Sequence, residues 1–305
     1  MPAILVENLS KSYGQLRAVD GINFAVEEGE IFGLLGPNGA GKTTTVEILA
    51  GLRQRDGGNV SVLGMDPGRR QAELKNRIGV QLQQAALYPR LTVLESARLF
   101  ASFYRRRLDP VQVVQQVGLA EKAGTQTRKL SGGQKQRLAI ALTMVGDADL
   151  VFLDEPTTGL DPQARRSLWD LILGLKKRGK TVFLTTHYME EAERLCDRVA
   201  IIDRGRIIAM DSPRALIDQH FNQRAVEFES DKLARDQTLG GLPGVTKVRQ
   251  NGDNVVTLYS TDITASIDAL MRYSREIQAP VEDLVVRHAT LEDVFLKLTG
   301  RRIRE

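Results

Sequence analysis

A glycine-rich segment that ends in a lysine and a threonine is the first part of the chain whose residue types and spacing could do chemistry. It reads Gly36-Pro37-Asn38-Gly39-Ala40-Gly41-Lys42-Thr43 and fits the P-loop pattern GxxxxGK[ST]. The glycines allow a tight turn whose N–H groups point at phosphate oxygens, and the following helix adds its N-terminal dipole. We expect Lys42 to reach the β- and γ-phosphates of a nucleotide, Thr43 to bind magnesium, and Thr44 to lie beside the same phosphates.

Two adjacent carboxylates follow an apolar run later in the chain. Leu150 to Leu153 is predicted to be a buried strand, and Asp154 and Glu155 stand at its end. Two acidic residues after a strand are, taken alone, most often a loop or a helix cap. Together with the P-loop they indicate that Asp154 holds magnesium, directly or through water. Glu155 would then orient and polarise the attacking water.

The segment Leu130-Ser131-Gly132-Gly133-Gln134 is similar to the signature of the ATP-binding cassette (ABC) family. Ser131 and Gln134 have the spacing of a capping box, and the two glycines, Gly132 and Gly133, expose backbone N–H groups at the start of a helix, which makes a second anion site. A flexible loop with a helix cap would explain this segment alone. The next residues, Lys135-Gln136-Arg137, continue the family pattern.

The resemblance assigns roles to three further residues. Tyr13 stands where the family carries an aromatic ring that stacks on adenine. Asp161, in Gly159-Leu160-Asp161-Pro162, matches the D-loop, and its position implies a contact in the nucleotide site. His187, in Thr185-Thr186-His187, matches the switch histidine that contacts the γ-phosphate.

The Q-loop glutamine, which in the family contacts magnesium and responds to the membrane partner, is ambiguous in this chain. Gln81, Gln83 and Gln84 lie close together. The flanking residues, Ile78-Gly79 before them and Leu87-Tyr88-Pro89 after them, favour Gln83.

The resemblance covers residues 3–220 and implies an ATPase that uses ATP and magnesium. In the family, two copies form a head-to-tail dimer in which each ATP lies between the P-loop of one copy and the signature of the other. Hydrolysis removes the γ-phosphate bridge and opens the dimer, and a separate integral-membrane permease uses that motion. The implied location is cytoplasmic, on the inner face of the membrane through the permease, and a homodimer is compatible with both half-sites.

Two segments narrow the resemblance to ATPases of the bacterial daunorubicin-resistance type of exporter. They are His187-Tyr188-Met189-Glu190-Glu191-Ala192-Glu193 and Leu291-Glu292-Asp293-Val294-Phe295-Leu296-Lys297-Leu298-Thr299-Gly300. A packed helix would explain the second segment equally well. The resemblance favours export, with import as the alternative.

The elements that must position these residues are indicated by apolar runs. The short apolar run Ile4 to Asn8 is compatible with a strand. Continuous apolar strands are expected at Ile31 to Leu35, Leu150 to Leu153, Thr181 to Leu184 and Val199 to Ile202. They alternate with helices such as Thr43 to Leu52, which favours an α/β fold with a parallel sheet covered on both faces. We expect a P-loop NTPase core over residues 1–220, with a helical subdomain at about 84–146.

A second domain is expected over residues 221–305. Strands are predicted at 225–229, 245–250, 254–260 and 281–286, and the Asn251-Gly252-Asp253 turn is typical of a hairpin. Helices are predicted at about 263–277 and 290–300. This accessory domain is therefore predicted to be α+β, with no catalytic constellation, and it would stabilise or regulate the dimer.

Composition limits the remaining alternatives. Forty-two basic and 38 acidic side chains give a net charge of +4. This excess of positive charge is too small to indicate a nucleic-acid partner. Soluble ABC proteins of the ribosome usually have two cassettes in one chain, and those that maintain DNA have a long coiled coil, for which the roughly 90 residues between Gly36 and Leu130 leave no room. Cys196 is the only cysteine, which excludes an intrachain disulfide and suggests a small buried thiol. Neither a signal peptide nor a spanning segment is predicted.

Overall fold

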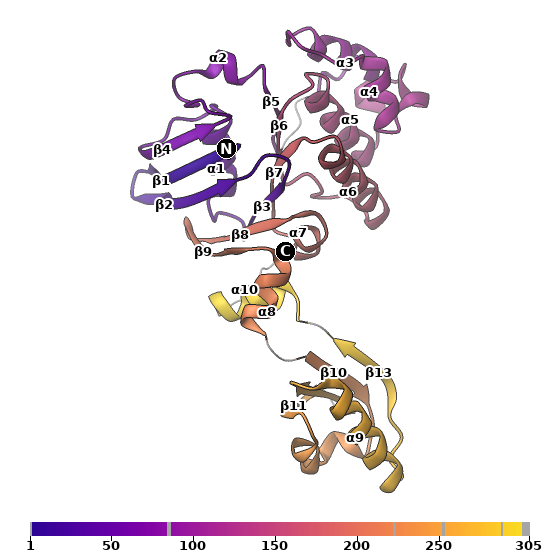
Figure 1. Ribbon diagram of the computed structural model, residues 1–305. Coiled ribbons are helices and arrows are strands. Elements are labelled where there is room, and N and C mark those ends of the chain that lie inside the picture. Colours follow the sequence, from indigo (N-terminus) through magenta and orange to yellow (C-terminus); the bar gives the residue numbers. More distant parts are fainter. Residues whose placement is uncertain (1, 84–86, 222–223, 252–253, 288, 301–305) are drawn as a thin grey trace. The chain divides into compact units, whose positions relative to one another are not determined.

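The computed structural model describes residues 2–83, 87–221, 224–251, 254–287 and 289–300. The described residues form two compact units, which divide between Pro213 and Arg214 (Figure 1). This division falls at the start of helix α8 (Pro213–His220), whereas the sequence prediction places the domain boundary at the end of that helix. Within the described residues, no helix is long and apolar enough to cross a membrane.

A six-stranded sheet forms the centre of the first unit. Its strands, in order across the sheet, are β5 (Ile78–Gln81), β6 (Leu150–Asp154), β7 (Thr181–Thr186), β3 (Ile31–Leu35), β8 (Arg198–Asp203) and β9 (Arg206–Asp211). The first five strands are parallel, and β9 runs antiparallel to β8. Every residue of β3, β6 and β7 is buried, because both faces of the sheet are covered. The predicted α/β fold is confirmed.

Three helices of this unit follow strands of the six-stranded sheet. They are α1 (Lys42–Leu49), α6 (Pro162–Lys177) and α7 (Met189–Leu195). Cys196 ends α7 and is 8% exposed, so the prediction of a small buried thiol is confirmed. Burial raises the pKa of this thiol well above its ordinary value.

An antiparallel sheet that the sequence analysis missed completes the core. It has the order β2 (Leu16–Val26), β1 (Ile4–Tyr13), β4 (Gly57–Val62). Only its first residues, Ile4 to Asn8, were predicted as a strand. Phe24 of β2 stacks on Phe32 of β3 with 5.5 Å between the ring centroids, which joins the two sheets in one apolar core.

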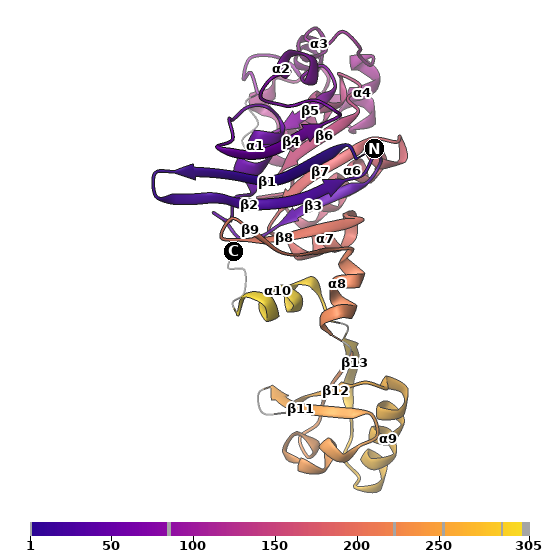
Figure 2. The same ribbon diagram turned by 60° about the vertical axis from the view of Figure 1, so that its left-hand side comes forward.

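The region between β5 and β6 is helical, as the subdomain prediction expects. Its helices are α3 (Val93–Ala101), α4 (Pro110–Gln116) and α5 (Gly132–Met144), with short 3₁₀ turns at Ala120–Lys122 and Thr127–Lys129, and the short α2 (Gln71–Leu74) precedes β5. Thr92 caps α3 in a capping box, and Asp109 caps α4 ahead of Pro110. Figure 2 shows α3 and α4 grouped away from strands β1 and β2.

The second unit is a four-stranded antiparallel sheet with a helix. The strand order is β11 (Val245–Asn251), β12 (Val255–Ser260), β10 (Arg224–Glu229), β13 (Glu282–Arg287). Helix α9 (Ile263–Glu276) buries Leu270 against Val226, Phe228 and Leu258 of the sheet, and 3₁₀ turns lie at Leu233–Arg235 and Gln237–Gly241. The predicted turn residues Gly252 and Asp253 lie outside the described residues.

Helices α8 and α10 (Leu291–Thr299) lie side by side in the second unit (Figures 1 and 2). Lys297 Nζ donates to the His220 carbonyl oxygen at 2.6 Å and lies over the Phe221 ring. Thr290 and Asp293 form a capping box at the start of α10, and Gly300 ends the helix with φ 71°.

Candidate functional site

The glycine-rich loop lies between the end of β3 at Leu35 and the start of α1 at Lys42. A side chain on Gly36 would place its Cβ 2.2 Å from the Ile202 carbonyl oxygen, and one on Gly41 would come within 2.3 Å of the Ala18 oxygen. Gly41 also has a φ of 107°. Glycine is therefore required at both positions, and the loop has the strand–loop–helix setting that a P-loop needs.

Lys42 points into a buried network of polar groups. Its side chain is 4% exposed, and Nζ donates to the carbonyl oxygens of Gly36 (2.8 Å) and Pro37 (3.1 Å). Nζ also lies 3.0 Å from Glu155 Oε1. The P-loop lysine and the acidic residue after β6 thus form a buried ion pair.

Glu155 is the residue on which the site converges. Its backbone has φ 48°, an uncommon value for a residue with a side chain, and its N–H donates to the carbonyl oxygen (3.1 Å) and hydroxyl (3.0 Å) of Thr185. Gln83 Nε2 donates to Glu155 Oε2 at 3.3 Å, and His187 Nδ1 lies 3.2 Å from the same oxygen. The His187 ring, with Lys42, holds the pKa of Glu155 at about 2 despite burial.

Asp154 lies directly beneath this network and is fully buried. The Thr185 hydroxyl donates to Oδ1, and the Thr43 hydroxyl lies beside the carboxyl. Burial raises the pKa of Asp154, and these two hydroxyls oppose the shift. Oδ2 is buried and accepts no hydrogen bond of normal geometry from the described residues. A carboxylate oxygen with free lone pairs beside a threonine hydroxyl fits a magnesium ion, which prefers oxygen ligands.

A pocket of about 370 Å³ lies beside Lys42, Gln83 and Glu155, and neither Asp154 nor His187 lines it. Its lining comprises Tyr13, Leu16, Ala18, Asn38, Gly39, Gly41, Lys42, Thr43, Thr44, Gln83 and Glu155. Tyr13 is 41% exposed, with the Arg53 guanidinium 5.3 Å from its ring centroid. The predicted P-loop, Tyr13, Gln83 and Glu155 are therefore brought together. Gln81, one alternative Q-loop candidate, is 3% exposed and does not line this pocket. Gln84, the other, lies outside the described residues.

The signature and D-loop residues do not line this pocket. Ser131 and Gln134 form the predicted capping box at the start of α5, where Ser131 and Gly132 are exposed. Asp161 caps α6 by accepting from the Ala164 N–H at 2.8 Å. In one copy of the chain, these groups therefore face solvent rather than the P-loop pocket.

Sequence reasoning missed several residues of the site. The Thr185 hydroxyl is hydrogen-bonded to both acidic residues, and its signal was a polar side chain directly after the apolar run Val182 to Leu184. Leu16 and Ala18 line the pocket from β2, a strand that was not predicted. No local pattern pointed to them.

Comparisons with known proteins agree with this geometry. Residues 19–158 match the family model described as "ABC transporter". The chain is 39% identical to Nod factor export ATP-binding protein I of Ralstonia nicotianae, over 100% of this chain and 96% of the relative. It is 37% identical to daunorubicin resistance ATP-binding protein DrrA2 of Streptomyces coeruleorubidus, over 98% and 97%.

A solved dimeric ATP-binding cassette in a post-hydrolysis state, bound to ADP and phosphate, superposes with a TM-score of 0.63 and 27% identity. The match covers 68% of this chain and 98% of that structure. The fold and the site define a P-loop ATPase. The chain belongs to the ABC transporter family, and it is an ATP-binding subunit that hydrolyses ATP.

Proposed function

We propose that the chain is the motor of an exporter, held at the cytoplasmic face of the membrane by a separate permease. The support for export is the set of relatives, whose names refer to Nod factor export and to daunorubicin resistance. The observation that carries the motor role is the convergence of Lys42, Gln83 and His187 on one acidic residue, Glu155.

In the proposed reaction, Glu155 orients the attacking water and takes its proton. A carboxyl with a pKa of about 2 is a weak base, and the ion pair with Lys42 is one of its causes. When the β- and γ-phosphates of ATP take the Lys42 ammonium, Glu155 loses that partner and its pKa rises. Nucleotide binding thereby makes Glu155 a stronger base before it accepts the proton of the attacking water. His187 then contacts the γ-phosphate.

Thr43, Asp154 and Gln83 are the proposed magnesium ligands. Asp154 contributes a buried carboxylate oxygen without a hydrogen bond, and the Thr43 hydroxyl lies beside it. Magnesium, when bound, neutralises charge on the β- and γ-phosphates. Tyr13 stacks on adenine at the open end of the pocket, and the N–H groups of the P-loop hold the phosphates.

A second copy of the chain completes each site in this proposal. The signature Ser131–Gln134 offers the start of α5 as an anion site, and that helix is 13 residues long. Asp161 lies at the start of the neighbouring α6. Since neither group lines the P-loop pocket of its own chain, a head-to-tail homodimer is the arrangement that brings them to ATP.

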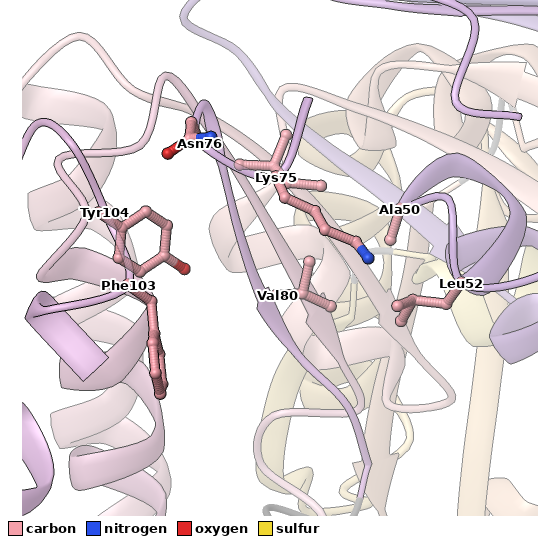
Figure 3. Close-up of a pocket in the computed structure, with 8 residues that line it drawn as sticks. Ala50, Leu52, Lys75, Asn76, Val80, Phe103 and Tyr104 are labelled. Atoms are coloured by element: carbon pink, nitrogen blue, oxygen red, sulfur yellow. The ribbon is translucent and has the colours of Figure 1, made fainter. Parts of the chain in front are cut away.

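A groove of about 350 Å³ is the proposed docking place of the permease (Figure 3). It lies between the residues after α1, strand β5 and the segment after α3. Leu52 and Phe103 are 51% and 63% exposed there, and Lys75 and Val80 line the same groove. Strand β5 leads directly to Gln83, so a permease segment in this groove would act on the residue that contacts Glu155. The expected occupant is a cytoplasmic segment of the permease with an apolar side chain for the groove.

The proposal is tested by steady-state MgATP hydrolysis against protein concentration, for the unmodified protein and for Glu155→Gln. We expect the rate to rise faster than linearly with concentration. The variant should bind ATP, stop turning over and accumulate as a dimer. A rate per molecule that is independent of concentration, with activity retained in Glu155→Gln, would overturn both the composite site and the assigned base.

Membrane association is tested by sedimentation with membranes that contain the co-expressed permease. Leu52→Glu should release the protein from these membranes, whereas Leu5→Glu, at a partly exposed position of β1, should not. Sedimentation with ribosomes or DNA instead would favour a non-transport ATPase. The near-balanced charge of the chain argues against a nucleic-acid partner.

A further inference from the structure

Glu191 is a buried acidic residue that the proposed reaction does not use. It lies in the first turn of α7, four residues after His187, and is fully buried. Its Oε1 accepts a hydrogen bond of 3.0 Å from Trp169 Nε1 of α6, and Trp169 is 2% exposed. Burying a carboxyl group costs free energy unless its partners compensate, so its retention in the core requires an explanation.

The Glu191 carboxyl lies beside the two segments that carry the catalytic side chains. The hydroxyl of Thr157, two residues after Glu155, and that of Thr186, directly before His187, lie beside it. Glu191 Oε2 makes no hydrogen bond of normal geometry within the described residues, so these two are neighbours rather than hydrogen-bond partners. Thr186 in turn fixes the turn around the histidine, because its Oγ1 accepts from the Tyr188 N–H at 2.9 Å. A single buried group therefore adjoins both halves of the Glu155–His187 pair.

The same region is linked to α6, the helix that Asp161 caps. Trp169 of α6 holds the Glu191 carboxyl. One turn earlier, the Arg165 guanidinium lies 4.6 Å from the centroid of the Tyr188 ring, and that ring lies 4.2 Å from the His187 ring. These contacts connect α6 to the turn that carries His187.

We propose that Glu191 is a positioning residue of the ATPase, which fixes the His187 turn relative to the Glu155 segment. Trp169 connects this carboxyl to helix α6, which Asp161 caps. The inference rests on the roles proposed above for Glu155 and His187. Neither Glu191 nor Trp169 lines the nucleotide pocket. Their effect is therefore on the geometry of the chemical step and not on nucleotide affinity, since misplacement of a reacting group by about 1 Å can lower a rate 100-fold.

The test compares kcat and KM for MgATP in Glu191→Leu, Glu191→Gln and Trp169→Phe. Leucine fills the buried volume without an acceptor, and apolar replacement of a buried ionisable group is often neutral or stabilising. We expect its kcat to fall about tenfold or more with KM within about twofold. Glutamine keeps an acceptor for Trp169 and adds a donor for the threonine hydroxyls, so kcat should return to within about threefold. Trp169→Phe should lie between these two.

Ile172→Ala is the matched control, because Ile172 is fully buried on the same helix as Trp169. It should lower the melting temperature and leave the kcat of the folded protein unchanged. The inference is overturned if Glu191→Leu keeps its kcat, if its loss appears in KM alone, or if Ile172→Ala loses as much kcat. If His187→Ala and Glu155→Gln themselves keep full activity, the proposed catalytic roles fail instead, which separates the two outcomes.

Discussion

The two units of the chain differ in the charged side chains that they bury. Among its described residues, the first unit buries four acidic or basic side chains, namely Lys42, Asp154, Glu155 and Glu191. In the described part of the second unit, the buried polar residues are hydroxyl-bearing: Ser230, Thr257, Ser260, Ser266 and Ser274. Burying an ionisable group has a high free-energy cost, whereas burying a hydroxyl group has a modest one once the hydroxyl is hydrogen-bonded.

The hydroxyls of the second unit are matched by local partners. Ser260 and Ser266 lie 2.7 Å apart, and Ser266 also lies 2.7 Å from the Pro243 carbonyl oxygen. Ser274 donates to the Ala279 carbonyl oxygen. These groups tie helix α9 and its flanking turns to the sheet. The comparison teaches that the buried polar groups of the second unit serve packing, whereas the first unit also buries charged groups, three of which, Lys42, Asp154 and Glu155, lie in the proposed nucleotide site.

The largest effect is expected at the buried ion pair of the first unit. Lys42→Ala removes the cation beside Glu155 and the proposed ligand of the β- and γ-phosphates. ATP hydrolysis should fall about 100-fold or more, the size of effect seen when one electrostatic contact to the reacting groups is lost. Steady-state phosphate release measures it. Lys180→Ala is the control, because Lys180 pairs with Asp147 away from the pocket, and it should keep its kcat. Equal losses in both variants would show that the burial comparison does not identify the site.

The P-loop and the acidic pair could be predicted because each lies within a few consecutive residues. Strands β3, β6 and β7 could be predicted because they are continuous apolar runs. The pairing of Lys42 with Glu155 could not, because it joins residues more than 100 positions apart in the chain. Glu191 could not either, since an acidic residue in the first turn of a helix is normally exposed and favoured by the helix dipole.

Strand β2 was missed because its partners and its irregularities are long-range. Its apolar pattern is interrupted at Asp20-Gly21, where Gly21 has φ 66° and Asp20 pairs with Arg206 of β9. Helix α6 was also not predicted, although Leu168, Ile172 and Leu175 lie at helical spacing and could have indicated it. The P-loop and the acidic pair could therefore be predicted from local patterns, whereas the contacts around them could be found only in the folded structure.

The next largest effect is expected in the core of the second unit. Phe228 is fully buried among Val226, Leu258 and Leu270. Phe228→Ala should lower the free energy of unfolding of this unit by about 3–5 kcal/mol, while the kcat of the folded first unit stays unchanged. Thermal unfolding with parallel ATPase assays checks both. Val285→Ala, at a position 53% exposed on β13, should change neither quantity. A loss of kcat in Phe228→Ala alone would show that the second unit takes part in hydrolysis.

A smaller effect is expected at the polar cluster beside α9. The Tyr273 hydroxyl donates to Asp236 Oδ2 at 2.7 Å and accepts from Thr238 Oγ1 at 2.7 Å. Tyr273→Phe should cost about 1 kcal/mol of stability, the usual net value of such a bond. Chemical denaturation measures it, and ATP hydrolysis should not change. Phe221→Leu is a comparison that leaves this hydroxyl cluster intact. An unchanged denaturation midpoint in Tyr273→Phe would show that these bonds add nothing to the packing of the unit.

The smallest effect is expected at the ion pair of Arg55 and Asp66, two charged residues of the first unit that are not deeply buried. Both nitrogens of the Arg55 fork donate to the Asp66 carboxyl at 2.9 Å, and these bonds, despite some burial, hold its pKa at about 2, below its ordinary 3.8. Because the folded-state pKa is lowered, this stabilisation is present above about pH 4 and is lost as the pH falls toward 2. The carboxyl is 26% exposed, so solvent screening limits the contribution to roughly 1 kcal/mol or less.

Asp66→Asn should therefore lower the denaturation midpoint at pH 7, and the difference from the unmodified protein should shrink between pH 4 and pH 3. Its kcat at pH 7 should match that of the unmodified protein, because Asp66 does not line the nucleotide pocket. A difference in stability that persists unchanged at pH 3 would mean that the arginine pair is not its source. If kcat fell instead, a charged group would affect catalysis without being deeply buried. The difference between the two units would then lie in where their charged residues stand in the fold and not in how deeply these residues are buried.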